Sequence, residues 1–219
     1  MIPRGIEVLW EQRDAIFYGF VNTIAITAVA AVCAGFLGLL LFALLISRVR
    51  TIEVALTWLI DLMRCVPFML FCYMIYYGLP SFGIVIGNLT AGIVALTLYN
   101  AAYIAELLRG GYAALPRDGI EAGHAFGFHG WRLLTRIILP PVLLSSTPML
   151  GNQLIQIIKD SAFLVIIAVQ ELTFAANSIQ ATYYVPFASF VCAMILYWLL
   201  CLAVEAAVRA VVVKAEMQR

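Results

Sequence analysis

Residues 17–46 of the chain read FYGFVNTIAITAVAAVCAGFLGLLLFALLI and contain no Asp, Glu, Lys or Arg. An α-helix needs roughly 20 consecutive, mainly apolar residues to cross the hydrocarbon core of a bilayer, and this stretch exceeds that length. It is also too long for the apolar core of a signal peptide, and no small-residue cleavage site follows it. We therefore interpret it as a retained membrane-spanning helix.

The composition of the whole chain indicates the same class. Of its 219 residues, 64% are hydrophobic and 11% are charged, and the net charge is +1. A soluble domain is roughly half apolar and about a quarter charged. This balance excludes a disordered chain, a secreted disulfide scaffold and a basic nucleic-acid-binding domain. We expect contact with membrane lipid and none with nucleic acid.

Four more apolar runs are long enough to cross a membrane, and they cover residues 54–77, 84–108, 142–169 and 187–213. Pro67 lies inside the second run and must kink it, because proline removes a backbone hydrogen bond. Pro140 and Pro141 precede the fourth run, and Pro186 opens the fifth. The sequence therefore predicts an all-α, polytopic membrane protein with five transmembrane helices, in one domain over residues 17–213.

The distribution of basic residues predicts the orientation of these helices, because Lys and Arg favour cytoplasmic loops. One side of the predicted membrane carries nine of them: Arg48, Arg50, Arg109, Arg117, Arg132, Arg136, Arg209, Lys214 and Arg219. The other side carries only Arg4 and Arg13. We expect an external N-terminus, with residues 1–16 as a tail that is either solvated or laid along the interface. The C-terminus, with residues 214–219 as a tail, is expected in the cytoplasm.

Residues 109–141 form the only long predicted loop, and it is cytoplasmic. Asp118 can cap a short helix that starts near Gly119, and Glu121 completes a capping-box-like pattern. Gly127 and Gly130 are expected to stop this helix. Its aromatic residues then project either toward a protein partner or toward lipid, and the residues alone leave both alternatives open.

The chain lacks the sequence patterns of a nucleotide or metal site. Neither of its two lysines, Lys159 and Lys214, follows a glycine, so the phosphate-binding loop Gly-x-x-x-x-Gly-Lys-Ser/Thr is missing. His124 and His129 lie beside no carboxylate cluster suited to a metal. We expect no catalytic residue, no metal site and no cofactor in this chain.

Polar residues within the predicted spans require an explanation, because a charge at mid-bilayer costs roughly 2.5–3.5 kcal/mol. In the fourth span Asn152, Gln156, Lys159 and Asp160 fall mostly on one helical stripe, which either lines a path for a zwitterionic solute or forms a polar seam between subunits. Arg64 lies one turn before Pro67 and either pairs with Asp61 or binds a carboxylate. Asn100 and Tyr103 of the third span supply further hydrogen-bonding groups.

Several segments resemble one family of transport proteins. Glu121-Ala122-Gly123, followed by Gly127 and then by residues 137–140 (IILP), resembles the EAA loop of permease subunits of binding-protein-dependent ABC importers. The departure is Gly123, where the family pattern has a second alanine. Further segments resemble the polar amino-acid branch of that family: residues 22–27 (NTIAIT), 64–67 (RCVP), 102–110 (AYIAELLRG) and 159–164 (KDSAFL).

This resemblance implies a type I ABC importer permease in the bacterial inner membrane, paired with a second copy or a sister permease. It also implies an external solute-binding protein and two cytoplasmic ATPase subunits, which bind ATP and Mg²⁺ and hydrolyse the ATP. The implied ATPase-coupling residues are Asp118, Glu121, Ala122, Gly123, Ala125, Phe126 and Gly127. The substrate is expected to be a polar amino acid or a derivative, bound by Arg64, Asn100, Tyr103, Asn152, Gln156, Lys159 and Asp160.

Two other functions are weighed against this one. An ion-gradient-driven secondary transporter predicts internal repeats, which five spans do not provide. A non-transporting scaffold or channel subunit leaves Lys159, Asp160 and Arg64 without a purpose. The sequence does not specify which amino acid is carried, or whether the second permease is identical.

Overall fold

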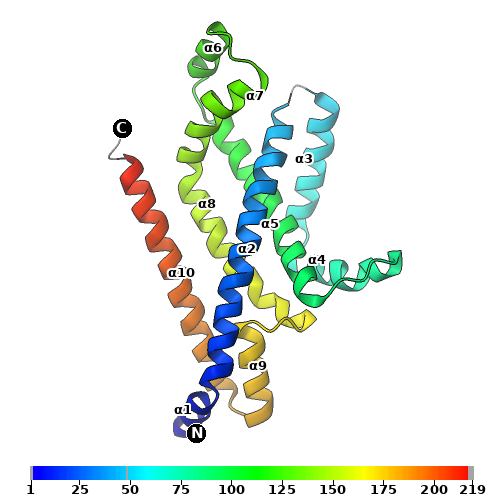
Figure 1. Ribbon diagram of the computed structural model, residues 1–219, viewed down its shortest axis with the longest axis vertical. Coiled ribbons are helices and arrows are strands. Elements are labelled where there is room, and N and C mark those ends of the chain that lie inside the picture. The colour runs from blue at the N-terminus through cyan, green and yellow to red at the C-terminus, as the bar shows by residue number, and fades with distance from the viewer. Residues whose placement is uncertain (1, 48, 217–219) are drawn as a thin grey trace.

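The computed structural model describes residues 2–47 and 49–216, and every regular element in these ranges is helical (Figure 1). The α-helices are α1 (Ile2–Glu11), α2 (Arg13–Leu45), α3 (Arg50–Cys65), α4 (Phe68–Tyr73), α5 (Asn88–Ala113), α6 (Arg117–Ala125), α7 (Gly130–Leu133), α8 (Leu139–Ser161), α9 (Leu172–Tyr183) and α10 (Pro186–Glu216). Short π-helical turns at Met74–Gly78 and Leu134–Ile138 and 3₁₀ turns at Leu79–Phe82 and Ala162–Ile167 connect some of them.

Four of the helical stretches are long and apolar enough to cross a membrane, and a bent pair brings the number to five. The four are Arg13–Leu45, Asn88–Ala113, Gly130–Ile167 and Pro186–Val213. The bent pair joins Arg50–Cys65 to Phe68–Phe82 at an angle of 106°. In Figure 1 this second part, which begins with α4, leaves the bundle sideways at mid-height.

The break in the second span lies at Pro67, where the sequence predicts a kink. Proline cannot donate the backbone hydrogen bond that the preceding turn needs, so carbonyl groups at the end of α3 lose their helical partners. The Tyr103 hydroxyl donates to the carbonyl of Arg64 at 3.1 Å, and the Tyr99 hydroxyl donates to the carbonyl of Val66 at 3.0 Å. Side chains of α5 therefore satisfy the backbone that the proline exposes.

Pro140 and Pro141 do not separate the fourth span from what precedes it, contrary to the expectation from sequence. They lie in the first turn of α8, and α7 and the π-turn Leu134–Ile138 run directly into that helix. The first turn of a helix tolerates proline, and a π-turn lets the preceding residues adapt to the lost donors. The continuous helical stretch that contains the fourth span begins at Gly130, before the apolar run that starts at residue 142.

Two segments that were predicted as loop or tail are helices. Residues 170–186 contain α9, whose N-cap is Glu171: its carboxylate accepts hydrogen bonds from the backbone amides of Thr173 and Phe174, each at 2.8 Å. The predicted N-terminal tail contains α1, which packs against α10. Both helices are too short to span a bilayer.

The core of the bundle lies where α2, α5 and α8 meet. Large side chains such as Phe42, Leu96, Leu108 and Ile157 are almost fully buried there. The bundle is tight, because a Cβ atom added at Gly38 of α2 would lie 2.6 Å from Cγ2 of Ile104 on α5.

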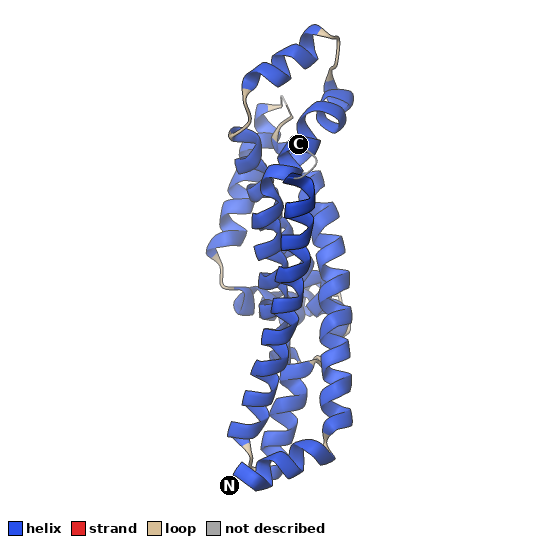
Figure 2. Ribbon diagram, turned by 90° about the vertical axis from the view of Figure 1, so that its left-hand side faces the viewer, coloured by secondary structure: helices blue, strands red, loops and turns tan. Residues whose placement is uncertain are grey.

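The two ends of the bundle differ in what they carry. In Figures 1 and 2, α6 and α7 lie at the same end as the C-terminus, and the N-terminus lies at the opposite end. In Figure 1, α1 and α9 share that opposite end. The predicted coupling loop is thus separated from the N-terminal end by the length of the spanning helices.

Candidate functional site

The break in the second span brings Arg64 close to the third span. The Arg64 guanidinium lies 5.6 Å from the centre of the Tyr103 ring, a cation–π distance. It lies 3.7 Å from the carboxylate oxygens of both Asp61 and Glu106. The predicted pair with Asp61 forms, and Arg64 has a second carboxylate partner that sequence spacing does not predict.

Glu106 is the centre of this charged cluster. Arg109, one helical turn further along α5, donates two hydrogen bonds to its carboxylate, from Nε at 2.7 Å and from an Nη nitrogen at 2.6 Å. The Glu106 side chain is also more buried than either arginine. Arg64 of α3 and Arg109 of α5 therefore share the half-buried carboxylate of Glu106. This arrangement links α3 to α5.

The side chains from Asn152 to Phe163 divide into two neighbouring stripes, one exposed and one buried, about 100° apart around the helix. Asn152, Gln156, Lys159 and Phe163 are exposed at spacings of four, three and four residues. Gln153, Ile157 and Asp160 are buried at the same spacings. Exposed amide and ammonium groups on a membrane-spanning helix are costly in lipid, so this exposed stripe favours contact with a subunit or an aqueous path.

The buried stripe of α8 forms a short hydrogen-bonded network with α5. The Gln153 amide donates to Oδ1 of Asn100 at 2.6 Å, and the Asn100 amide donates to the carbonyl of Leu96 at 3.0 Å. Asn100 is fully buried, so its side chain is already occupied inside the bundle. Gln153 is absent from the residues singled out by sequence, although its position seven residues before Asp160 puts the two on one helical face.

Asp160 is the single acidic residue of α8, and it is buried, with 3% of its surface exposed. Its Oδ1 accepts a hydrogen bond from the Gln156 amide at 2.8 Å. Its Oδ2 has no hydrogen-bond partner among the described residues. A buried carboxylate oxygen without a donor is costly, and a ligand that donates a hydrogen bond would remove that cost.

At the C-terminal end of the bundle, α6 forms the predicted short helix of the long loop. It ends in a Schellman motif: the amide of Phe128 donates to the carbonyl of Gly123 at 2.9 Å, and the amide of Gly127 donates to the carbonyl of His124 at 3.0 Å. Gly127 has φ +81°, in the left-handed region that favours glycine. The prediction that Gly127 stops this helix is confirmed.

The start of α6 differs from the prediction. The helix begins at Arg117 after Pro116, and no side chain caps it. Asp118 therefore lies within the first turn, where its negative charge still favours the helix dipole, but the predicted cap at Asp118 is wrong. The reason is local, because Pro116 already imposes the extended backbone that an N-cap residue needs.

The faces of α6 explain the departure at Gly123. Gly123 is buried, and a Cβ atom there would lie 3.0 Å from Cδ1 of Leu133 and 3.3 Å from Cγ1 of Ile137. An alanine at this position would require the Leu133 and Ile137 side chains to shift by a few tenths of an ångström. The other predicted coupling residues are exposed: Asp118, Glu121, Ala122, Ala125, Phe126 and Gly127.

An open apolar surface lies beside these residues. Phe126 and Trp131 are 83% and 71% exposed, respectively, whereas Ile120 and Phe128 pack inward against the cluster of α2, α5 and α8. The loop is thus fixed to the bundle by one side and presents aromatic side chains on the other. Exposed aromatics on a rigid element are typical of a protein-docking surface.

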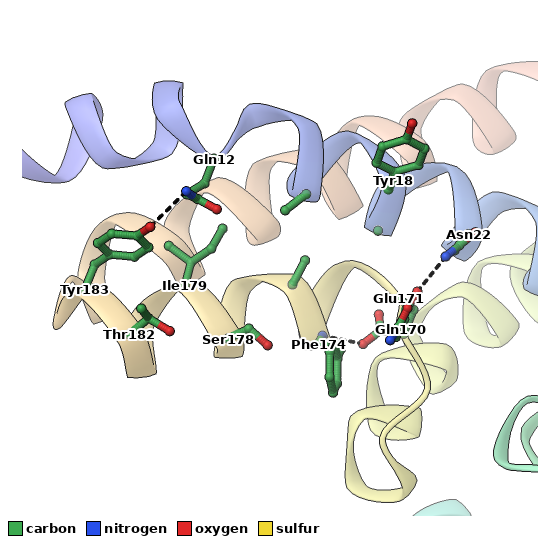
Figure 3. Close-up of a pocket in the computed structure, with 13 residues that line it drawn as sticks. Gln12, Tyr18, Asn22, Gln170, Glu171, Phe174, Ser178, Ile179, Thr182 and Tyr183 are labelled. Carbon is green, nitrogen blue, oxygen red and sulfur yellow. Dashed lines mark hydrogen bonds between the residues drawn. The ribbon is translucent and has the colours of Figure 1, made fainter.

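A groove lined by both polar and apolar side chains occupies the opposite end, between the start of α2 and α9 (Figure 3). The Gln12 amide donates to the Tyr183 hydroxyl at 2.9 Å, and the Asn22 amide donates to the carbonyl of Gln170 at 2.8 Å. Exposed uncharged side chains such as Ser178 line the groove between these two links. The segment before α9 is therefore held to α2, and the end of α9 is held to Gln12, the residue before α2.

These features define a class of protein before any comparison is made. The chain is a helical membrane protein with polar groups inside its spanning helices, an exposed loop with projecting aromatic side chains at one end and a groove of mixed polarity at the other. Its sequence carries no phosphate-binding loop.

The chain belongs to the family described as the binding-protein-dependent transport system inner membrane component, which its residues 31–215 match. The glutamine transport system permease protein GlnP of Escherichia coli K12 is 36% identical over 155 residues, covering 67% of this chain and 70% of GlnP. The probable glutamine ABC transporter permease protein GlnM of Bacillus subtilis 168 is 27% identical, covering 90% of this chain and 91% of GlnM.

Solved structures share the fold. The crystal structure of an amino acid ABC transporter with histidines matches with a TM-score of 0.86 at 26% identity, covering 94% of this chain and 96% of that one. An inward-facing structure of the MetNI methionine ABC transporter matches with a TM-score of 0.73 over 90% of this chain, and at 24% identity that likeness concerns the fold alone. The predicted family and the fold of a type I ABC importer permease are confirmed. Neither comparison favours a secondary transporter or a scaffold.

Proposed function

We propose that this permease subunit moves a polar amino acid or a close derivative across the bacterial inner membrane, in an importer powered by partner ATPases. The observation that carries the proposal is the arrangement of Lys159 and Asp160 on α8. Lys159 is exposed on one stripe, and Asp160 is buried on the other with one carboxylate oxygen unpartnered. No carboxylate whose side chain the structure describes forms an ion pair with Lys159.

The two charges suit a zwitterionic solute. A protonated amino group can donate to Oδ2 of Asp160, and a carboxylate can accept from the Lys159 ammonium. Gln156 lies one turn from each of these residues and holds Asp160 at 2.8 Å, while Asn152 extends the exposed stripe by another turn. The ammonium and carboxylate groups of a free amino acid can thus both bind complementary side chains at one level of α8.

The remaining predicted substrate residues act less directly in this proposal. Asn100 is occupied by Gln153 and by its own helix, so it positions the buried stripe of α8. Tyr103 and Arg64 hold the broken second span together. Since Arg64 shares Glu106 with Arg109, it is suited to a gate that opens when the charged cluster rearranges.

The amino-acid class rests on relatives as well as on chemistry. Similar permeases are named for glutamine and arginine transport, and a similar structure is titled as an amino acid transporter with histidines. All three solutes carry the same ammonium and carboxylate groups, which are the groups that Lys159 and Asp160 complement. The proposal therefore concerns the class of solute and not one amino acid.

The coupling loop receives the energy in this scheme. Two cytoplasmic ATPase subunits bind ATP with Mg²⁺, and the exposed face of α6, with Glu121, Ala122 and Phe126, seats in a groove of one ATPase. The basic residues near α6 and at the C-terminal end support a cytoplasmic location for that end. An external binding protein then delivers solute at the end that carries α9, and a second permease, identical or a sister, completes the path along the exposed stripe of α8.

Uptake by reconstituted proteoliposomes tests the proposal. With the binding protein, the ATPases and ATP present, Lys159→Ala and Asp160→Asn are expected to reduce uptake of the binding protein's ligand at least tenfold, with ATPase co-purification unchanged. Arg50→Gln removes an exposed positive charge at the end of the bundle and serves as the matched control. Undiminished uptake by both α8 variants would contradict a solute path along this helix.

A further inference from the structure

The N-terminal helix α1 has three distinct faces. One face packs on α10, because Gly5 and Val8 are buried and a Cβ atom at Gly5 would lie 2.7 Å from Cβ of Ala188. A second face carries charge, with Arg4, Glu7 and Glu11 exposed. A third face presents exposed Ile6 and Trp10. A helix that packs on a spanning helix, with one charged and one apolar free face, is typical of a membrane–water interface.

The apolar face of α1 borders a groove that three helices form at this end of the bundle. Its walls are almost entirely apolar, and its volume is about 560 Å³. The lining side chains include Leu9 and Trp10 from α1, Phe17 and Phe20 from α2, and Cys192 and Leu196 from α10. Its floor rests on the protein core, since Phe20 and Leu196 pack against the buried cluster of Leu172, Ala176 and Ala193.

Two charged residues, Arg13 and Asp14, also line this groove. The Arg13 guanidinium lies 5.4 Å from the centre of the Trp10 ring, and its Nε is 3.9 Å from Oδ1 of Asp14. Both charged side chains are more than half exposed. The groove thus combines apolar walls with one cationic and one anionic group.

Arg13 and Asp14 lie at the level of the lipid headgroups. Residues 15–47 carry no charged side chain, and α2 has 33 residues, which makes it about 50 Å long at 1.5 Å per residue. A bilayer is roughly 40–45 Å thick with its headgroups, so the end of α2 that carries Arg13 reaches the headgroup region. Tryptophan also favours that region.

We propose that this groove is a phospholipid-binding site: an acyl chain fills the channel between α1, α2 and α10, and the headgroup binds at Arg13 and Asp14. The Arg13 guanidinium takes the phosphate, for which its fork of donors is suited. Asp14 takes a headgroup ammonium and repels a lipid with net negative charge. The site therefore prefers a zwitterionic lipid, phosphatidylethanolamine, over anionic phosphatidylglycerol.

Continuity with the outer surface of the spanning helices argues for lipid over a protein occupant. Phe17 of α2 lines the groove and is exposed, as is Trp10 of α1. These side chains face hydrocarbon in a chain whose helices span a membrane, so the groove opens onto lipid. The inference needs only that the helices span a membrane, and it does not depend on which solute is carried.

Native mass spectrometry of the purified transporter tests the site. After delipidation and titration with an equimolar mixture of phosphatidylethanolamine and phosphatidylglycerol, we expect one tightly held phosphatidylethanolamine for each copy of this chain. Cys192→Phe fills the channel and is expected to remove this lipid, whereas Met194→Phe, at an exposed position on α10 outside the groove, is the matched control and should retain it. Arg13→Gln is expected to lower the preference for phosphatidylethanolamine about two- to five-fold, and Arg4→Gln is not.

A fluorescence measurement keeps the test decisive if Cys192→Phe fails to fold. In nanodiscs that contain phosphatidylethanolamine with brominated acyl chains, bromine quenches nearby tryptophan. The fluorescence of Trp10, obtained as the difference between the wild type and Trp10→Phe, is expected to be quenched. Equal lipid retention in Cys192→Phe and Met194→Phe, a preference for phosphatidylglycerol, or an unquenched Trp10 would each overturn the proposal.

Discussion

Replacing Gly127 with valine tests how the coupling loop is built. Gly127 sits at φ +81° directly after α6, and a Cβ atom there would meet no heavy atom within 4 Å. The substitution therefore creates no steric clash with neighbouring residues, and its whole effect is on the backbone conformation. Gly119 provides a matched control, because it also lies in open space but inside α6, with an ordinary helical backbone.

The magnitude follows from the left-handed backbone. An L-residue in that region costs about 1–2 kcal/mol, and a β-branched residue is disfavoured there more than most. The Schellman hydrogen bonds to Gly123 and His124 are lost if the chain avoids the strain. Since 1.4 kcal/mol changes an equilibrium tenfold, we expect the population of correctly ended α6 to fall about 5- to 30-fold relative to its unfolded alternatives. A helix of nine residues has little stability of its own to absorb that change.

The assay compares ATP hydrolysis with solute uptake in proteoliposomes. For Gly127→Val we expect a lower uptake per ATP hydrolysed, or loss of the ATPases on purification, together with faster amide hydrogen exchange over residues 117–128. Gly119→Val is expected to leave all three unchanged, because valine fits a helix at least as well as glycine. Identical behaviour of the two variants would refute the role assigned to the left-handed turn.

Three further predictions concern the bundle. Gly38→Leu places side-chain atoms where α5 already lies, so we expect it to lower the stability in detergent by about 1–3 kcal/mol, measured by thermal unfolding; Gly35→Leu, in open space, should have no comparable effect. Glu106→Gln removes the charge that two arginines share and should lower the free energy of unfolding by about 1–3 kcal/mol. Glu205→Gln, in an exposed pair, should lower it by less than about 1 kcal/mol. Equal losses of stability would count against a role for the Glu106 cluster. Lys159→Met is expected to raise the KM for uptake while leaving ATP hydrolysis intact, and an unchanged KM would show that the ammonium does not contact solute.

The broad architecture can be predicted from the sequence because the bilayer limits what apolar runs can do. Long uncharged segments such as residues 17–46 have no stable alternative to a spanning helix. The break at Pro67 follows equally directly from the chemistry of proline, and the end of α6 from Gly127, whereas Gly130, also predicted to stop α6, begins α7. Each of these predictions depends on one residue type acting through its own backbone.

Features that depend on tertiary packing are those that the sequence analysis did not find. α9 is amphipathic only weakly, and it is stabilised by the Glu171 cap and by contacts with α2 and α10. The proline pair looks like a break, yet it lies in the first turn of α8, directly after a π-turn. Gly123, a departure from the family pattern by sequence alone, has a physical reason only when Leu133 and Ile137 are seen beside it.

The candidate site also combines features that the sequence predicts with features that depend on packing. The helical spacing of Asn152, Gln156 and Lys159 places them on one face without any structure. That Asp160 belongs to the neighbouring, buried stripe, and that Gln153 links this stripe to Asn100, depends on which side of α8 packs against α5. Sequence periodicity predicts which residues lie on one face of a helix. Helix packing determines which of these faces is exposed and which is buried.

The central claim is that this chain moves solute only when partner ATPases act on α6. The most direct measurement is accumulation of a labelled amino acid, the ligand of the associated binding protein, in proteoliposomes made with and without the ATPase subunits. We predict ATP-dependent accumulation that needs the ATPases and the binding protein and that is insensitive to proton or sodium gradients. Accumulation against a gradient by the permease chains without the ATPases would contradict the account.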